Sequence, residues 1–204
     1  MLEEQTYKTI VGSQSLELPL VALSDELTIA LLICVDHGVS FTEIAGKELA
    51  EMLVPFEPEA IVSVATMGIP LAIEVSRALG LDDYVILHKT PKIHLGDTYA
   101  EPLRSITTDA EQLLRMDPRR VDAVRGRKVA IVDDVISTGA SSLAAIRLLE
   151  RVGANPVALG TLVTEGSEWR TTLGSHAHNV QALGAIPIFR PDSGTNELVE
   201  DWGY

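Results

Sequence analysis

The segment 129–141 constrains the fold of this chain more than any other part of the sequence. It begins with four apolar residues, continues with Asp133 and Asp134 and two further apolar residues, and then changes to small and hydroxyl-bearing residues from Ser137 to Ser141. A short apolar run without polar alternation is typical of a parallel strand that is covered on both faces. The segment therefore predicts a strand, a tight loop and the start of a helix, in direct succession.

The loop of this unit is suited to a phosphorylated sugar. Open α/β sheets bind ligands at the carboxyl ends of their strands. Residues 138–141 can offer backbone N–H groups, hydroxyls and a helix N-terminus to a phosphate, and Asp133 and Asp134 can accept hydrogen bonds from sugar hydroxyls. Two other interpretations compete. One is an ordinary turn capped by Asp. The other is a receiver domain whose paired acids bind Mg²⁺, although such acids lie near the N-terminus rather than beyond residue 130.

The remainder of the chain alternates between short apolar runs and amphipathic segments. This alternation predicts an α/β fold with a doubly wound parallel sheet. We expect strands at 61–65, 84–88, 128–132 and 156–163, and helices at 68–79 and 141–152. Before them we expect extended segments at 7–11 and 16–21, a helix from Ser24 to about Val35, and a helix after a capping box at Ser40–Glu43.

No repeat or linker divides the chain, so we expect a single domain over residues 1–204. Residues 1–23 form an accessory segment, and residues 165–204 form a C-terminal hood or tail. The long polar insertion at 89–117 is typical of a lid, in which 104–108 and 112–116 can pair as a hairpin.

Composition excludes several functions. The net charge of −13 disfavours nucleic acid and anionic membranes as partners, since both reward a basic surface. No apolar run reaches the length of a membrane span. Cys34 is the only cysteine, so no internal disulfide can form, and the N-terminus has no signal-peptide pattern. We therefore expect a cytoplasmic protein.

The order of residues in segment 129–141 resembles the phosphoribosyl diphosphate (PRPP) signature of type I phosphoribosyltransferases. The resemblance extends over most of residues 7–165. It implies the fold of that family, with a small hood and a lid loop, an enzyme that uses PRPP and Mg²⁺, and a homodimer. It also implies that Asp133 and Asp134 hold the ribose, and the metal only indirectly through PRPP. The 5′-phosphate would be held by Ser137, Thr138, Gly139, Ala140 and Ser141.

The same resemblance assigns three further segments. The turn of Ala65, Thr66, Met67 and Gly68 would be the pyrophosphate loop, although its sequence also fits an ordinary strand-to-helix turn. Lys89 and Lys92 follow a strand and would act in catalysis on the pyrophosphate, unless they are simply solvated lysines. Arg104, in the lid, would reach the same group, unless it is exposed on a structural hairpin.

The base is less constrained. Val135 and Trp169 are candidates to contact it, with hydrophobic packing as the alternative for Trp169. Met67 stands where adenine enzymes usually carry arginine, and Ser137 stands where hypoxanthine-guanine enzymes place aspartate. The segment 18–24 and the insertion resemble adenine-type enzymes. We therefore expect a purine phosphoribosyltransferase of nucleotide salvage that acts on adenine. The alternatives are a xanthine or orotate-like enzyme, and a PRPP-binding regulator with little catalysis.

Overall fold

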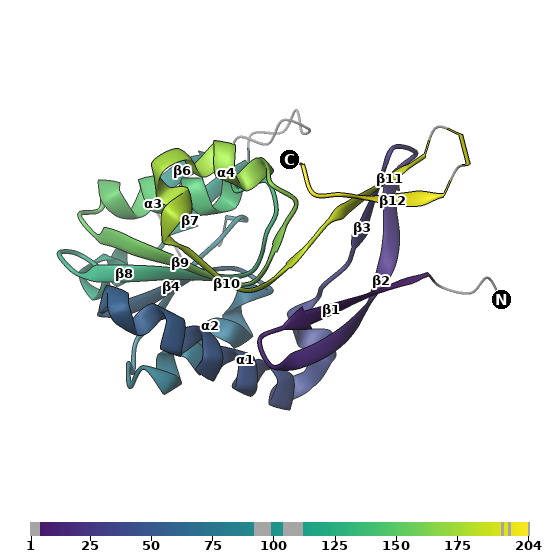
Figure 1. Ribbon diagram of the computed structural model, residues 1–204. Helices are drawn as coiled ribbons and strands as arrows, with labels where there is room; N and C mark the ends of the chain where they lie inside the picture. The colour runs from purple at the N-terminus through teal and green to yellow at the C-terminus, as the bar shows by residue number, and fades with distance from the viewer. Residues whose placement is uncertain (1–4, 92–98, 104–111, 193, 196, 204) are drawn as a thin grey trace.

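The fold is built on a five-stranded parallel sheet, which helices cover on both faces (Figure 1). The computed structural model describes residues 5–91, 99–103, 112–192, 194–195 and 197–203. The strand order is β10–β9–β8–β4–β5, and all four pairings are parallel. The doubly wound parallel sheet that the sequence predicts is therefore confirmed. Its strands are β4 (Ala60–Val64), β5 (Tyr84–Leu87), β8 (Lys128–Ile136), β9 (Asn155–Glu165) and β10 (Val180–Ile186).

Two layers of helices enclose this sheet. Helices α1 and α2 cover one face, while α3, α4 and a β-hairpin cover the other (Figure 1). None of the described helices is long and apolar enough to cross a membrane. The helices are α1 (Gly38–Leu53), α2 (Gly68–Ala78), α3 (Ala140–Arg151) and α4 (Glu168–Leu173), and the 3₁₀ turns are Cys34–His37, Val54–Phe56, Pro118–Ala123 and Gly174–Asn179.

The apolar run of β8 is explained by these two layers. Val129 and Ile131 pack in the core on the α3 side, whereas Ala130 and Val132 pack in the core on the side of α1 and α2. All four side chains are at most 2% exposed. Full burial of a Val or Ile side chain contributes about 1.5–3 kcal/mol, so both faces of the strand stabilise its position.

The insertion contributes the hairpin on the α3 side. Strand β6 (Tyr99–Leu103) pairs antiparallel with β7 (Gln112–Met116). The expected strand at 112–116 is thus confirmed, but its partner is β6, and the other expected strand, 104–108, lies outside the described residues. A bridge between His88 and Arg115 connects the hairpin to the end of β5.

A second, antiparallel sheet joins the two ends of the chain beside the central sheet (Figure 1). The edge-to-face contact between Tyr7 and Phe189, with ring centroids 5.2 Å apart, connects strands from the two ends. In the order of the sheet, its strands are β1 (Thr6–Val11), β2 (Gln14–Ser24), β3 (Leu27–Ala30), β11 (Ile188–Pro191) and β12 (Leu198–Asp201).

The expected helix from Ser24 to Val35 is wrong. Strand β2 continues to Ser24, β3 follows after a short turn, and only Cys34–His37 forms a 3₁₀ turn. An apolar run of this length fits a buried helix and a buried strand equally well by periodicity. Residues 27–30 form a strand rather than a helix because they pair with both β2 and β11.

The expected capping box is also wrong. Helix α1 begins at Gly38, so Ser40 and Glu43 lie inside it rather than at its start, and no side chain caps its N-terminus. Thr42 instead donates a hydrogen bond to the Gly38 carbonyl oxygen at 3.0 Å. A glycine with φ of +81° allows the chain to turn into the helix earlier than the motif suggested.

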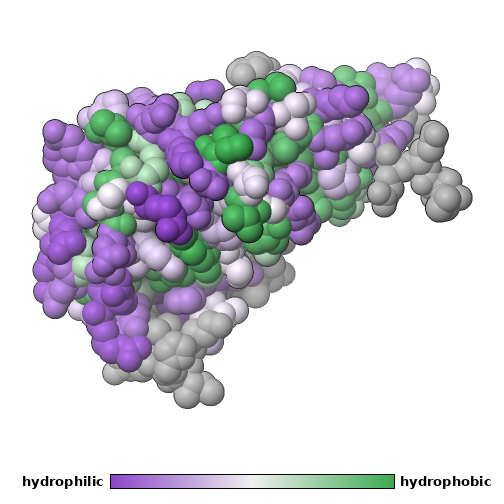
Figure 2. Space-filling view, turned by 90° about the horizontal axis from the view of Figure 1, so that it is seen from below, coloured by the Kyte–Doolittle hydropathy of each residue, from purple (hydrophilic) through white to green (hydrophobic). Residues whose placement is uncertain are grey.

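The face formed by α1 and α2 carries apolar residues among hydrophilic ones (Figure 2). Val39 is 80% exposed and Val35 is 50% exposed. These two residues help to line a hollow of about 300 Å³ between the two helices, together with Pro70 and Ile73.

Contact between the two sheets depends on a glycine. A Cβ atom at Gly184 of β10 would overlap the carbonyl oxygen of Ile10 in β1 and would lie 3.5 Å from Val163 Cγ1. We expect Gly184→Ala to lower the unfolding free energy by about 1–3 kcal/mol, because the backbone of β1 must move away. Thermal unfolding measures this, with the exposed neighbour Ala185→Ser as control. Equal melting temperatures for both variants would show that the close contact between Gly184 and Ile10 does not contribute to stability.

Candidate functional site

A cleft of about 220 Å³ lies at the carboxyl ends of β4, β5 and β8. Most of the residues that the sequence singled out meet there, although they come from three separate segments. Lys92 and Arg104 lie outside the described residues. The cleft is lined by Val64, Ala65, Thr66, Met67, Lys89, Asp133, Asp134, Val135, Ile136, Ser137, Thr138, Gly139, Ala140, Ser141 and Ser142.

The loop after β8 forms one wall of the cleft. Gly139 has a φ of +79°, and a Cβ atom there would lie 3.2 Å from Trp169 Cα and 3.3 Å from Leu173 Cγ. Only glycine fits this conformation without strain. This close packing on α4 holds the start of α3 beside the cleft. The backbone N–H groups in the first turn of α3 that have no partner within the helix can therefore bind a ligand there.

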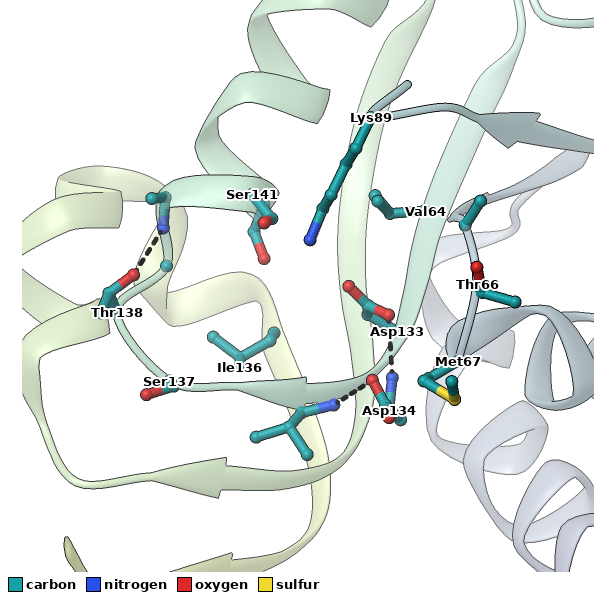
Figure 3. Close-up of a pocket in the computed structure, with 15 residues that line it drawn as sticks. Val64, Thr66, Met67, Lys89, Asp133, Asp134, Ile136, Ser137, Thr138 and Ser141 are labelled. Carbon is teal, nitrogen blue, oxygen red and sulfur yellow. Dashed lines mark hydrogen bonds between the residues drawn. The ribbon is translucent and has the colours of Figure 1, made fainter. Parts of the chain in front are cut away.

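Asp133 and Asp134 lie at the floor. The Asp133 side chain points into the cleft (Figure 3), and its Oδ1 accepts a hydrogen bond from the Asp134 backbone N–H at 3.1 Å. Asp134 Oδ1 accepts one from the Val135 N–H at 3.0 Å. Burial, reinforced by the charge of Asp134, raises the pKa of Asp133 to about 8. Burial also raises the pKa of Asp134. The two carboxyl groups lack enough nearby positive charge to stabilise their ionised forms. They are therefore suited to bind a cation or to accept hydrogen bonds from the hydroxyls of a sugar.

The turn between β4 and α2 forms the opposite wall. The peptide bond between Ala65 and Thr66 is cis. A Cβ atom on Gly68 would lie 2.6 Å from Asp133 Oδ1 and 3.1 Å from Asp133 Cα, so only glycine allows this turn to approach the acid so closely. As a result, the N-terminus of α2 and the carboxyl pair face the same cleft.

Lys89 is the one cation among the described residues that line the cleft. It follows β5, and its ammonium group extends toward Asp133 and Ser141 (Figure 3). Its positive charge favours the ionised form of Asp133 and partly offsets the rise of that pKa. Arg115 holds the backbone of Lys89 in place, since its Nη1 donates to the Lys89 carbonyl oxygen at 3.1 Å.

Glu165 is a residue that sequence reasoning missed. It ends β9, is 8% exposed, and its Oε2 accepts a hydrogen bond from Ser137 Oγ at 2.6 Å. Burial raises the pKa of this carboxyl, and the Ser137 hydroxyl opposes the rise. The signal in the sequence was an acid at the carboxyl end of an apolar strand, but only the fold shows that it lies beside Ser137.

Trp169 requires a correction. Its side chain is 3% exposed and belongs to the core on the α3 side, and its Nε1 donates to the Gly166 carbonyl oxygen at 3.1 Å. The indole therefore supports the loop from behind and presents no face to the cleft. Hydrophobic packing, the alternative for this residue, describes its position, whereas Val135 does line the cleft.

Comparison with known proteins gives a consistent result. Residues 40–175 match the family model of the phosphoribosyl transferase domain. A xanthine phosphoribosyltransferase of Laribacter hongkongensis is 25% identical over 146 residues, which are 71% of this chain and 76% of that protein. An orotate phosphoribosyltransferase of Thermotoga maritima is 26% identical over 152 residues, 74% of this chain and 68% of that protein. The crystal structure of an adenine phosphoribosyltransferase from Rhodothermus marinus superposes with a TM-score of 0.62 at 25% identity, over 74% of this chain and 83% of that one.

The chain belongs to the type I phosphoribosyltransferase family, as the order of residues 129–141 indicated. Members of this family form a class of pentosyl-transferring enzymes. The relatives act on different bases by name, so membership establishes the class of reaction and leaves the base open.

The raised pKa of Asp133 leads to a prediction about stability. Between the usual carboxyl range near pH 4 and about pH 8, the folded protein binds more protons at this residue than the unfolded chain does. Its unfolding free energy should therefore fall as the pH rises through this window. Asp133→Asn cannot ionise, so we expect its melting temperature to depend less on pH and to exceed that of the wild type near pH 9.

Thermal unfolding from pH 5 to 9 tests this, with Asp82→Asn, at an exposed position, as the control for loss of a carboxylate. Parallel pH profiles for the wild type and Asp133→Asn would show that Asp133 ionises normally.

Proposed function

We propose that the protein is a Mg²⁺-dependent purine phosphoribosyltransferase that transfers the 5-phosphoribosyl group of PRPP to adenine in nucleotide salvage. One observation carries this proposal. A single cleft is lined by a pair of acids, a loop that offers N–H groups and hydroxyls, a second turn at a helix N-terminus, and one lysine. These are the groups that a ribose bearing a phosphate and a diphosphate requires.

Each wall of the cleft would hold one part of PRPP. Asp133 and Asp134 would accept hydrogen bonds from the ribose hydroxyls and so orient the reacting carbon. The loop of Ser137, Thr138, Gly139, Ala140 and Ser141 would hold the 5′-phosphate. The turn of Ala65, Thr66, Met67 and Gly68 would hold the pyrophosphate.

Catalysis would consist mainly of stabilising the leaving group. Glycosyl transfer passes through an oxocarbenium-like state, in which negative charge develops on the departing pyrophosphate. Lys89 and the N–H groups of the 65–68 turn would stabilise that charge, and Lys92 and Arg104 would add to it from the insertion. The 89–117 segment would act as a lid that excludes water. No covalent nucleophile is needed.

The acids also suit Mg²⁺. No group of three or more His, Cys, Asp or Glu among the described residues could hold a metal by itself, but carboxylate oxygens are preferred by Mg²⁺, which commonly completes its shell with substrate phosphates and water. Asp133 and Asp134 would therefore hold it through PRPP. When bound, the ion supplies positive charge to the pyrophosphate oxygens.

Val135 would contact the base. The likeness to the Rhodothermus marinus enzyme supports adenine, whereas the sequence relatives support xanthine or orotate as alternatives. We further propose a cytoplasmic homodimer of single-domain chains. The apolar hollow around Val39 and Ile73 supports a second copy as partner, and the buried, unpaired Cys34 is consistent with a reducing compartment.

Release of pyrophosphate from PRPP and Mg²⁺ tests the function directly. We expect turnover with adenine and little with hypoxanthine, guanine, xanthine, orotate or uracil, each supplied separately. Turnover with another base would support the transferase activity but show that adenine is not the substrate. PRPP binding without turnover on any base would favour the alternative of a PRPP-binding regulator.

Lys89→Ala tests the assignment of the leaving-group cation. We expect kcat to fall by at least about tenfold, the effect of roughly 1.4 kcal/mol in the transition state, with little change in the KM for the base. The exposed Lys47 of α1, in an ion pair with Glu43, provides a matched control as Lys47→Ala. Normal turnover of Lys89→Ala would reject the role of Lys89.

A further inference from the structure

A buried hydroxyl of β9 holds the backbone that carries the acid pair. Thr161 is 0% exposed, and it lies opposite Asp133 in the parallel pairing of β8 with β9. Its Oγ1 donates a hydrogen bond to the Asp134 carbonyl oxygen at 2.9 Å and lies 3.1 Å from the Val163 carbonyl oxygen. A threonine hydroxyl has one hydrogen, so the Asp134 carbonyl, as the nearer group, takes the larger share of it.

This hydrogen bond fixes a peptide group that also reaches the carboxylate of Asp134. The Asp134 carbonyl and the Val135 N–H belong to one planar peptide unit. The hydroxyl of Thr161 bonds the carbonyl end of that unit, and its N–H end donates to Asp134 Oδ1 at 3.0 Å. Rotation of the peptide would move both ends together. The direction of the Val135 N–H, and with it the orientation of the Asp134 carboxylate, therefore depends on the bond from Thr161.

The pairing of the two strands leaves a role for this hydroxyl. The pairing of β8 with β9 passes over Asp134, although it includes Asp133 and Val135 on either side. A buried carbonyl without a donor costs free energy comparable to a lost hydrogen bond, and the hydroxyl of Thr161 supplies a donor. The Asp134 N–H also has a side-chain partner, since it donates to Asp133 Oδ1 at 3.1 Å. Side chains thus help to arrange the backbone of the acid pair.

A second hydroxyl, on the other side of β8, provides a comparison. Ser63 of β4 is also 0% exposed and lies opposite Val132, one residue before the acids. Among the described residues its Oγ has no hydrogen-bond partner. Two fully buried hydroxyls therefore flank β8 close to the acids, but of these two only that of Thr161 is bonded to the backbone of the acid pair. The contrast separates the effect of the bond from the effect of a buried hydroxyl near the cleft.

We propose that Thr161 is a positioning residue, which holds the Asp134–Val135 peptide so that the Asp134 carboxylate meets a hydroxyl of the bound sugar. Thr161 is fully buried and does not line the cleft, so it acts on the ligand only through Asp134. The inference rests on the proposed function, because it takes the acids to hold the ribose. It makes the preference for a ribose over a deoxyribose depend on a residue of the core.

Sugar phosphates that differ by one hydroxyl test this role, with binding measured by calorimetry. Ribose 5-phosphate is compared with 2-deoxyribose and 3-deoxyribose 5-phosphates, and the wild type should prefer ribose 5-phosphate to both. Thr161→Val replaces the hydroxyl by a methyl group of similar size and should reduce the preference over at least one deoxy sugar by about fivefold. Thr161→Ser retains the hydroxyl and should retain the preference. Ser63→Ala, which removes the other buried hydroxyl, should leave the preference unchanged.

Several outcomes would overturn the positioning role. Equal binding of all three sugar phosphates by the wild type would do so, as would a Thr161→Val variant that weakens all three alike, since Thr161 would then support only the stability of the fold. An equal loss of preference in Ser63→Ala would show that the bond to Asp134 is not the cause. Melting temperatures show whether the variants fold. If Thr161→Val does not, an unchanged preference in Thr161→Ala overturns the proposal.

The binding test separates this inference from the proposed function. A preference for ribose that depends on Thr161, without release of pyrophosphate from PRPP on any base, would support the positioning role and reject the transferase. Release of pyrophosphate, together with an unchanged preference in Thr161→Val, would support the transferase and reject the positioning role. Failure of the wild type to bind any of the three sugar phosphates would also reject the positioning role, while the release of pyrophosphate would still decide the transferase.

Discussion

The close approach of the 65–68 turn to Asp133 is the contact on which the cleft depends. A side chain at Gly68 would lie 2.6 Å from Asp133 Oδ1, so the turn after β4 reaches the end of β8 this closely only because residue 68 has no side chain. This contact places the acids beside the N-terminus of α2. It also shields them partly from water, and this desolvation raises the pKa of Asp133 to about 8. Two partly buried acids with a single lining lysine destabilise the folded protein, and the cores on both faces of the sheet offset that cost.

An overall charge of −13 is compatible with a site for polyphosphates because local groups determine the potential there. The N-termini of α2 and α3 supply N–H groups to opposite walls, and Lys89 supplies the cation between them. Helix-terminal effects fall off within one turn, so acids elsewhere on the surface scarcely change them. The net charge therefore disfavours nucleic acid and anionic membranes as partners of the surface as a whole, but it does not determine which ligands the cleft can bind.

The sequence predicted what depends on local pattern. The parallel strands and the loop after β8 follow from apolar runs and from small residues at fixed positions, and the structure confirms them. Prediction failed where residues far apart in the sequence determine the local structure or the burial of a side chain. Residues 27–30 form a strand because β11, far along the chain, pairs with them. Trp169 is buried because Gly139 leaves space for α4 to pack closely. Glu165 was missed because its partner Ser137 lies 28 residues away.

The same limit explains why resemblance defines the reaction but not the base. The cleft is built from backbone N–H groups, carboxylates and glycines, whose function depends on position alone, and the chain is similar to enzymes for xanthine, orotate and adenine alike. Recognition of a base depends on where individual hydrogens point. Thr138 and Ser137 are adjacent hydroxyl residues, yet the Ala140 N–H leaves one a donor and Glu165 leaves the other an acceptor. Glu165 lies outside the signature segment, so the direction in which the Ser137 hydroxyl donates depends on a residue that the signature does not contain.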